Sequence, residues 1–377
     1  MRNVFIIDAK RTAVAPRGTA FRDHEALELA APVFQALMAA NHCSPDMIQA
    51  VFMGNALYGG GNPARVAALA AGIPDHVEAM TIDTQCCSGL DAIMLAATHI
   101  ASGQADIVIA GGVESYSRSP IRLQRPRNAD EQPEAYSRPP FTPWADRDPD
   151  MIAAAAQLAE ELQIPRTAQE SYAIRSHETA FAAPFNRNEI VPVSETRRDT
   201  FTRQLSPALC RRLPLLAGSP GFGQTAATIA VEADAAAAVL MVSEQVLAHF
   251  NITGHPVRYR AGRRGGGDPA RPALAPIGVV QKLMQDASIQ LADIAAAEVM
   301  EAFAVQAMAC IDATGLQQES VNRSGGALAR GHPIGASGAI LAVRLWHELQ
   351  SERSGAAGLS MIAAAGGLGS AVLLEKP

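Results

Sequence analysis

An internal repeat is the sequence feature that most constrains the fold. Residues 87–89, Cys-Ser-Gly, open an apolar run of helical period that is followed by a buried strand at 107–110. Residues 336–338, Ala-Ser-Gly, open a second helix that is followed by a strand at 359–365. Duplication of one strand–helix unit is the simplest explanation. We expect two similar halves packed around a pseudo-twofold axis, with the starts of both helices close to one site.

The rest of the chain alternates strands with helices. In the first half we expect strands at 4–7 and 47–53 and helices at 25–40 and 63–71. In the second half a strand at 294–300 matches the one at 47–53. This alternation predicts an α/β fold with mostly parallel strand pairing.

A long insertion interrupts the first half. Seven prolines and several arginines are spread over residues 119–150, and helices are expected at 151–162 and 167–183. Because proline breaks helices and removes a backbone donor, we interpret this segment as an excursion from the sheet. It can serve as a lid, a ligand-binding flap or an oligomer contact, and the alternative is a tolerated surface insertion.

After the insertion the chain returns to the sheet. An apolar segment at 235–242 and a strand at 257–260 complete the first half, and residues 263–272, RRGGGDPARP, have the composition of a linker. The predicted domains are a first half at 1–117, an inserted loop domain at 118–233, a return to the first half at 234–262 and a second half at 263–377.

Charge and cysteine content exclude several classes of protein. The formal net charge of −6 argues against nucleic acid or an anionic membrane as the main partner. Five cysteines without regular spacing do not form a disulfide framework, and the nine histidines lack the spacing of zinc ligands. No apolar run has the length of a signal-peptide core or a membrane span. We therefore expect a cytoplasmic protein without a metal.

Two adjacent cysteines, Cys86 and Cys87, stand at the start of the first central helix. Free backbone N–H groups and the helix dipole favour negative charge at that end, so the sequence predicts a lowered thiol pKa. The small residues Ser88 and Gly89 leave room for a substrate carbonyl. The alternative is that both cysteines are small, buried hydrophobic residues.

The second half offers a histidine at the matching place. His332 lies in a Gly-His-Pro-Ile-Gly loop before the second central helix, which favours an exposed, positioned imidazole. Facing a cysteine across the twofold axis, it is a candidate general base for thiolate formation. The glycines at 366–369 do not form a dinucleotide loop, because a strand-like segment follows them in place of a helix.

Five segments together resemble the thiolase family over nearly the whole chain. VFIIDAKRT resembles its first strand and turn, TQCCSGLDA its nucleophile motif, GGVESYSRSP its GGxESMSxxP segment, EAFA the end of its NEAFA motif, and SGGALARGHPIGASGA its NGGAxAxGHPxGxSGA motif. The resemblance implies a five-layer αβαβα fold of two duplicated halves with an inserted loop domain. It also implies dimers or tetramers and the transfer of acyl groups between coenzyme A and a carbon or sulfur nucleophile.

The resemblance also implies roles for individual residues. Cys86 matches the acyl-accepting cysteine of the family, and His332 matches the histidine that activates it. The backbone N–H groups of Cys86 and Ala365 match an oxyanion hole, where fixed donors stabilise developing charge. On the same basis, the residues expected to line the substrate site are Met300, Gly331, Ala363 and Gly366.

The chain departs from the family motifs at several polar positions. Ala363 stands where the family has a second cysteine, which moves the α-proton of the acyl acceptor. Met300 replaces the asparagine of NEAFA, Ala230 replaces a serine near pantetheine, and residues 150–157 lack the family's histidine. These losses argue against an ordinary Claisen condensation.

The sequence therefore predicts an acyltransferase that forms a thioester on Cys86 from acyl-CoA or an acyl carrier protein, without a tightly bound cofactor. The acceptor would be a thiol, an amine, an activated carbon nucleophile or water. One alternative is an acetyl-CoA acetyltransferase or 3-ketoacyl-CoA thiolase with a substitute base, such as His332 in a double role. Another is a non-catalytic thiolase-fold subunit that binds a partner or an acyl ligand. Between a homodimer and a homotetramer, the altered insertion favours the dimer.

Overall fold

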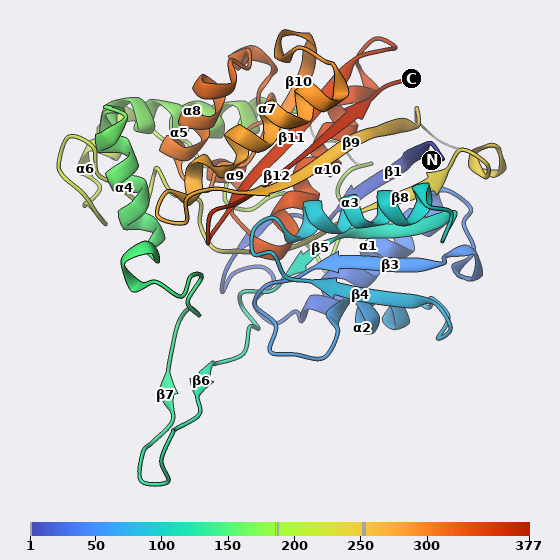
Figure 1. Ribbon diagram of the computed structural model, residues 1–377, viewed down its shortest axis with the longest axis horizontal. Helices are drawn as coiled ribbons and strands as arrows, with labels where there is room; N and C mark the ends of the chain where they lie inside the picture. The colour runs from blue at the N-terminus through green and yellow to red at the C-terminus, as the bar shows by residue number, and fades with distance from the viewer. Residues whose placement is uncertain (1, 185, 187, 251–253) are drawn as a thin grey trace.

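The computed structural model describes residues 2–184, 186, 188–250 and 254–377. Its helices and strands form five layers (Figure 1). The outer helices α1 (Ala26–Ala40) and α2 (Pro63–Ala70) cover one half of the sheet, and α7 (Ala275–Ala287) covers the other. Between the halves lie α3 (Ser88–Ala101) and α10 (Ile334–Gln350). The expected α/β architecture of five layers is confirmed.

The strands of both halves form one continuous sheet around the two central helices. Its order is β4-β3-β5-β8-β1-β9-β12-β11-β10, with β2 paired to β8, and β1 and β9 join the halves. These strands are β1 (Val4–Arg11), β2 (Ala15–Pro16), β3 (Ala50–Gly54), β4 (Glu78–Ile82), β5 (Ile107–Glu114), β8 (Ala233–Ser243), β9 (Val257–Gly266), β10 (Ile294–Val299), β11 (Ala357–Ala364) and β12 (Leu368–Glu375).

Strand pairing is mixed, so the expectation of mostly parallel pairing is wrong. β3 is parallel to β4 and β5, and β10 is parallel to β11, as the strand–helix repeat predicts. β8 is antiparallel to β5 because the chain leaves β5 and enters β8 at the same end of the two strands, where Glu114 lies opposite Ala235. β12 is antiparallel to β11 because a tight turn reverses the chain at Gly366 and Gly367, which have φ of 78° and 77°.

The prediction of a linker at 263–272 is also wrong for its first four residues. Residues 263–266 belong to β9, which pairs with β1 on one side and with β12 on the other. Half-buried and exposed residues alternate along β9, as they do in a strand with one solvated face. The arginines and glycines of this segment resemble a linker in composition, but their period of two fits a strand.

The expected helices occur within about one residue of their predicted bounds. The expected strand at 47–53 begins later, because Pro45–Met47 forms a short 3₁₀ turn. No helix in the described part of the chain is both long enough and apolar enough to cross a membrane. The remaining α-helices are α4 (Met151–Glu161), α5 (Arg166–Ala182), α6 (Pro207–Arg212), α8 (Ala304–Thr314) and α9 (Ala327–Arg330).

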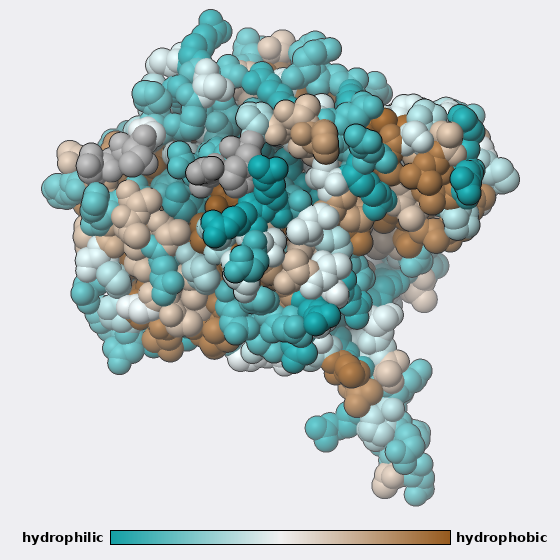
Figure 2. Space-filling model, turned by 180° about the vertical axis from the view of Figure 1, so that it is seen from behind, coloured by the Kyte–Doolittle hydropathy of each residue, from teal (hydrophilic) through white to brown (hydrophobic). Residues whose placement is uncertain are grey.

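The insertion between β5 and β8 begins with an arm that projects from the body of the molecule (Figure 1). The arm holds a short antiparallel pair, β6 (Leu123–Gln124) and β7 (Glu134–Ala135). Figure 2 shows mostly hydrophilic surface on the arm and an apolar patch where it leaves the body. Ile121 is 88% exposed and Leu123 57%. After the arm, α4, α5 and α6 pack beside the second half.

Glycines let the two central helices approach each other closely. A Cβ added to Gly338 of α10 would lie 2.5 Å from the backbone nitrogen of Leu90 in α3. A Cβ added to Gly89 of α3 would lie 2.7 Å from the backbone nitrogen of Ala339. Side chains at these positions would push the helices apart, because protein interiors are already close-packed. The starts of α3 and α10 are therefore held together.

Replacement of Gly338 by alanine is expected to lower the free energy of unfolding by about 1–3 kcal/mol, because the added methyl group has no space. Gly278→Ala in α7 is the matched control, since nothing lies within 4 Å of a Cβ added there. That change should raise the free energy of unfolding by about 0.5–1 kcal/mol, because glycine is a poor helix former. Urea unfolding followed by circular dichroism measures both. Equal effects at the two positions would contradict the tight helix contact.

Candidate active site

Cys86 and His332 meet where the two central helices begin. Cys86 lies two residues before α3, and His332 lies two residues before α10. The Cys86 Sγ is 3.2 Å from the His332 Nε2. This contact confirms that the two helix starts share one site.

The turn that carries Cys86 is held by local hydrogen bonds. Gln85 has φ of 55°, in the left-handed region that is uncommon for residues other than glycine. Its backbone N–H donates to the Asp83 Oδ1 at 2.9 Å. The Ser88 Oγ accepts the backbone N–H of Thr84 at 2.9 Å. A sharp, braced turn between β4 and α3 therefore fixes the position of the thiol.

Hydrogen bonding also fixes the tautomer of His332. Its Nδ1 lies 2.6 Å from the Ser337 Oγ, and the Ser337 hydroxyl donates to the carbonyl oxygen of Pro333 at 2.9 Å. Because the only hydroxyl hydrogen is used in that bond, the Ser337 oxygen accepts the Nδ1–H of His332. The Nε2 is then unprotonated and faces the thiol of Cys86. The site thus places a proton acceptor directly against a potential nucleophile.

Burial controls the ionisation of this pair. It raises the pKa of the Cys86 thiol to about 12, although the backbone N–H groups of Cys86 and Ala365 act to lower it. The carboxylates of Glu114 and Asp83 raise it further. Burial also lowers the pKa of His332 to about 4. The resting pair is a neutral thiol and a neutral imidazole, so the lowered thiol pKa expected at the helix start is wrong.

The two adjacent cysteines have different environments. Cys87 is fully buried in the core, with its Sγ 3.6 Å from the carbonyl oxygen of Ile362, whereas Cys86 is half-buried. Burial raises the pKa of Cys87 well above its usual value. Of the two thiols, the Cys86 thiol is the one that a substrate can reach.

The turn after β11 supplies the backbone groups opposite the thiol. Ala365 is the first residue after this strand, and its N–H is close enough to act on the Cys86 sulfur. Gly366 follows with positive φ, and a Cβ built on it would lie 3.1 Å from the carbonyl oxygen of Phe141. The insertion also contacts the neighbouring loop after β9, where Arg147 forms a 3.0 Å ion pair with Asp268. These contacts place the insertion against the turn that carries Ala365, and its role as a lid, a flap or an oligomer contact stays a prediction.

The other predicted site residues surround this arrangement. Gly331 has φ of 120°, and a Cβ there would lie 2.7 Å from the Cβ of Ala233, so only glycine fits directly before His332. Ala363 pairs with Gly369 in the sheet and offers only a methyl group. Met300 is 1% exposed and packs in the core cluster that contains Cys87. That Gly331, Gly366, Ala363 and Met300 line the substrate site stays a prediction.

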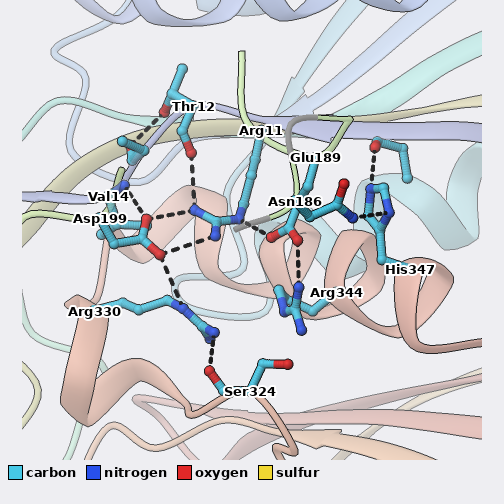
Figure 3. A network of polar contacts seen from close by, with 12 residues as sticks. Arg11, Thr12, Val14, Asn186, Glu189, Asp199, Ser324, Arg330, Arg344 and His347 are labelled. Atoms are coloured by element: carbon cyan, nitrogen blue, oxygen red, sulfur yellow. Dashed lines mark hydrogen bonds and ion pairs between the residues drawn. The ribbon is translucent and has the colours of Figure 1, made fainter. Parts of the chain in front are cut away.

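A buried ionic network supports the segment that leads to His332 (Figure 3). The Arg330 Nε donates to Asp199 at 3.1 Å, and Arg11 donates to both oxygens of Asp199 at 2.7 and 3.0 Å. The Arg11 Nε donates to Glu189 at 2.6 Å, and Arg344 binds the other oxygen of Glu189. Burial alone would raise the pKa of Glu189, but the two arginines hold it well below its usual range. Carboxylates of the insertion thereby join both halves of the fold.

Several of these residues were not identified from the sequence. Ser337 was noted only as part of the repeat, and Glu114 only within the GGVESYSRSP segment. The partners in the ionic network are 131 to 188 residues apart, so no local pattern connects them. Within the described residues, no group of three or more histidine, cysteine, aspartate or glutamate side chains could hold a metal ion.

Comparison with known proteins gives matches over the full length. Residues 4–245 match the model of the thiolase N-terminal domain, and residues 255–376 match that of the thiolase C-terminal domain. A provisionally named acetyl-CoA C-acetyltransferase of Bacillus subtilis strain 168, YhfS, is 36% identical over 380 residues, which cover 99% of each chain.

Solved structures agree with these matches. The Bacillus anthracis acetyl-CoA acetyltransferase superposes with a TM-score of 0.93 at 30% identity, covering 100% of this chain and 99% of the other. Human mitochondrial 3-ketoacyl-CoA thiolase in complex with CoA gives a TM-score of 0.91 at 28% identity, covering 100% of this chain and 98% of the other.

The raised thiol pKa predicts slow alkylation of Cys86 near neutral pH. The thiolate fraction is small there and increases as the pH approaches the thiol pKa of about 12. The rate with iodoacetamide, followed by peptide mass spectrometry, should stay low between about pH 6 and 8 and still be rising at about pH 10. A plateau below pH 8 would show that the thiolate is already formed in the resting protein.

Proposed function

The chain belongs to the thiolase family, and from this premise we propose that it loads an acyl group from acyl-CoA onto Cys86 and passes it to an acceptor. The observation that carries the proposal is the 3.2 Å contact between the Cys86 Sγ and the unprotonated Nε2 of His332. A purely structural protein would have no need for a thiol held against a base of fixed tautomer. CoA is present in the related human mitochondrial 3-ketoacyl-CoA thiolase structure.

In the loading step, His332 takes the proton of the Cys86 thiol while the sulfur attacks the carbonyl carbon of the thioester. Because the resting pair is neutral, the proton moves during the attack and not before it. The backbone N–H groups of Cys86 and Ala365 donate to the carbonyl oxygen as it becomes negative. When the tetrahedral intermediate collapses, the thiolate of coenzyme A leaves and takes the proton from His332. An acyl thioester remains on Cys86.

The transfer step reverses these roles with a second nucleophile. His332 removes a proton from an incoming thiol, amine or water, the nucleophile attacks the acyl carbon, and the sulfur of Cys86 leaves and recovers the proton. Ala363 cannot move a proton, and the thioether of Met300 is only a weak acceptor in place of an amide that could hold a catalytic water. We therefore propose an acceptor that needs no second cysteine, which includes a carbon nucleophile that is already activated.

A second candidate function is acetyl-CoA acetyltransferase with a substitute base. The full-length similarity to relatives that carry this name favours it. After loading, His332 is again neutral and could remove the α-proton of a second acetyl-CoA. Neither candidate function identifies the acyl donor, because an acyl carrier protein presents the same thioester group as acyl-CoA.

Intact-protein mass spectrometry after separate incubations with a panel of acyl-CoAs and with acylated carrier proteins tests the loading step. We expect an adduct of the acyl mass on the wild type, none on Cys86→Ala, and an adduct on the matched control Cys87→Ala. If only acyl carrier proteins label the chain, the donor assignment is wrong. If no thioester labels it, the chain is a binding subunit and not an acyltransferase.

The substitution Ala363→Cys tests the missing second cysteine. It should raise the formation of acetoacetyl-CoA from acetyl-CoA by about 10²-fold, because it supplies an acid–base group for the α-proton. Ala364→Cys is the matched control, since its side chain points to the opposite face of β11. Chromatography of the CoA thioesters measures the product. A wild type that condenses acetyl-CoA as fast as Ala363→Cys would favour the substitute base.

A further inference from the structure

Glu114 is a buried carboxylate beside the active site. The proposed reaction assigns no role to it. It ends β5 and is 1% exposed. Its Oε2 accepts the backbone N–H groups of Gly335 at 2.9 Å and Ala56 at 3.0 Å. Its Oε1 accepts the side-chain N–H of Asn55 at 2.9 Å and the backbone N–H of Leu57 at 3.3 Å. All four partners are donors, as an ionised carboxylate requires.

These bonds join the start of α10 to the loop after β3. Gly335 lies in the first turn of α10, three residues after His332, where backbone N–H groups have no partner within the helix. Glu114 satisfies one of them and places negative charge at the positive end of the helix dipole. One carboxylate thus holds the helix start that carries His332.

The fit around this carboxylate leaves little room for movement. A Cβ added to Gly335 would lie 2.6 Å from the Cα of Asn55 and 3.0 Å from the Glu114 Oε2. A Cβ added to Gly112, in the same strand as Glu114, would lie 2.0 Å from the carbonyl oxygen of Gly335. The start of α10 is therefore seated directly on β5 and on the loop after β3.

We propose that Glu114 is a positioning residue that sets the distance between the His332 Nε2 and the Cys86 Sγ by clamping the first turn of α10. This inference rests on the proposed function, in which His332 and Cys86 are the reacting pair. The competing view is that Glu114 stabilises the fold without any effect on that pair.

Protonation should loosen the clamp, because an O–H would then point at an N–H donor. Burial raises the pKa of Glu114 to about 7, although the N–H groups of Ala56, Gly335 and Leu57 act to lower it. The effect of His332 on Cys86 should therefore fade as the pH falls through this value. The other ionisable groups around Glu114 are Asp83 and Cys86 before α3, Tyr116 after β5, and Glu25, Tyr58 and Arg118 beside the same small cavity.

Alkylation of Cys86 by iodoacetamide at pH 7 tests the proposal without an acyl donor. We expect Glu114→Gln to slow alkylation by about 10- to 100-fold, because His332 no longer lies at the right distance. In a His332→Ala background the same change should leave the rate equal or higher, because it only removes a negative charge near the thiol. Slowing by the same factor in both backgrounds would overturn the proposal. Glu25→Gln, at the rim of the cavity, is the matched control and should change neither rate.

A second variant keeps the proposal testable if Glu114→Gln does not fold. Asn55→Ala removes one of the four donors, so the pKa of Glu114 should rise. The His332-dependent part of the alkylation rate should then be lost at higher pH than in the wild type, and an unchanged profile would overturn the proposal. Failure of acyl loading would refute the proposed function but would not alter these rates.

Discussion

The close packing of α3 against α10 is the constraint on which the rest of the structure depends. Each helix begins beside one member of the reacting pair, so the distance between Cys86 and His332 follows from the distance between the helices. Glycines at the contact allow the two backbones to approach closely, and Gly338 of α10 packs directly against the backbone of Leu90 in α3. The continuous sheet packs against both helices with strands from each half of the fold.

Burial gives this pair its chemical character. Burial keeps the thiol and the imidazole neutral, so the proton is transferred during the reaction and no thiolate is preformed. The same low dielectric strengthens the N–H groups that face a developing oxyanion. Two buried carboxylates near the pair have several partners each: Glu114 accepts from four donors, and Asp199 lies between two arginines.

What could be predicted from the sequence depended on local pattern. The repeat and its helical period led to both central helices, and these led to Cys86 and His332 at one site. The direction of β8 and the extent of β9 were missed because strand pairing is decided by segments far apart in the chain. The thiol pKa was predicted in the wrong direction because burial outweighs the helix start. Glu114 lies within the GGVESYSRSP segment, but its proposed role depends on a contact with Gly335, 221 residues away.

The most direct test of the central claim is a crystal structure of the chain soaked with acetyl-CoA. If Cys86 is the acyl acceptor, its Sγ should be bonded to the acetyl carbon, with the acetyl oxygen between the N–H groups of Cys86 and Ala365. His332 should keep its Nδ1 bond to Ser337. Coenzyme A bound near an unmodified Cys86, or an acetyl group on another residue, would contradict the account.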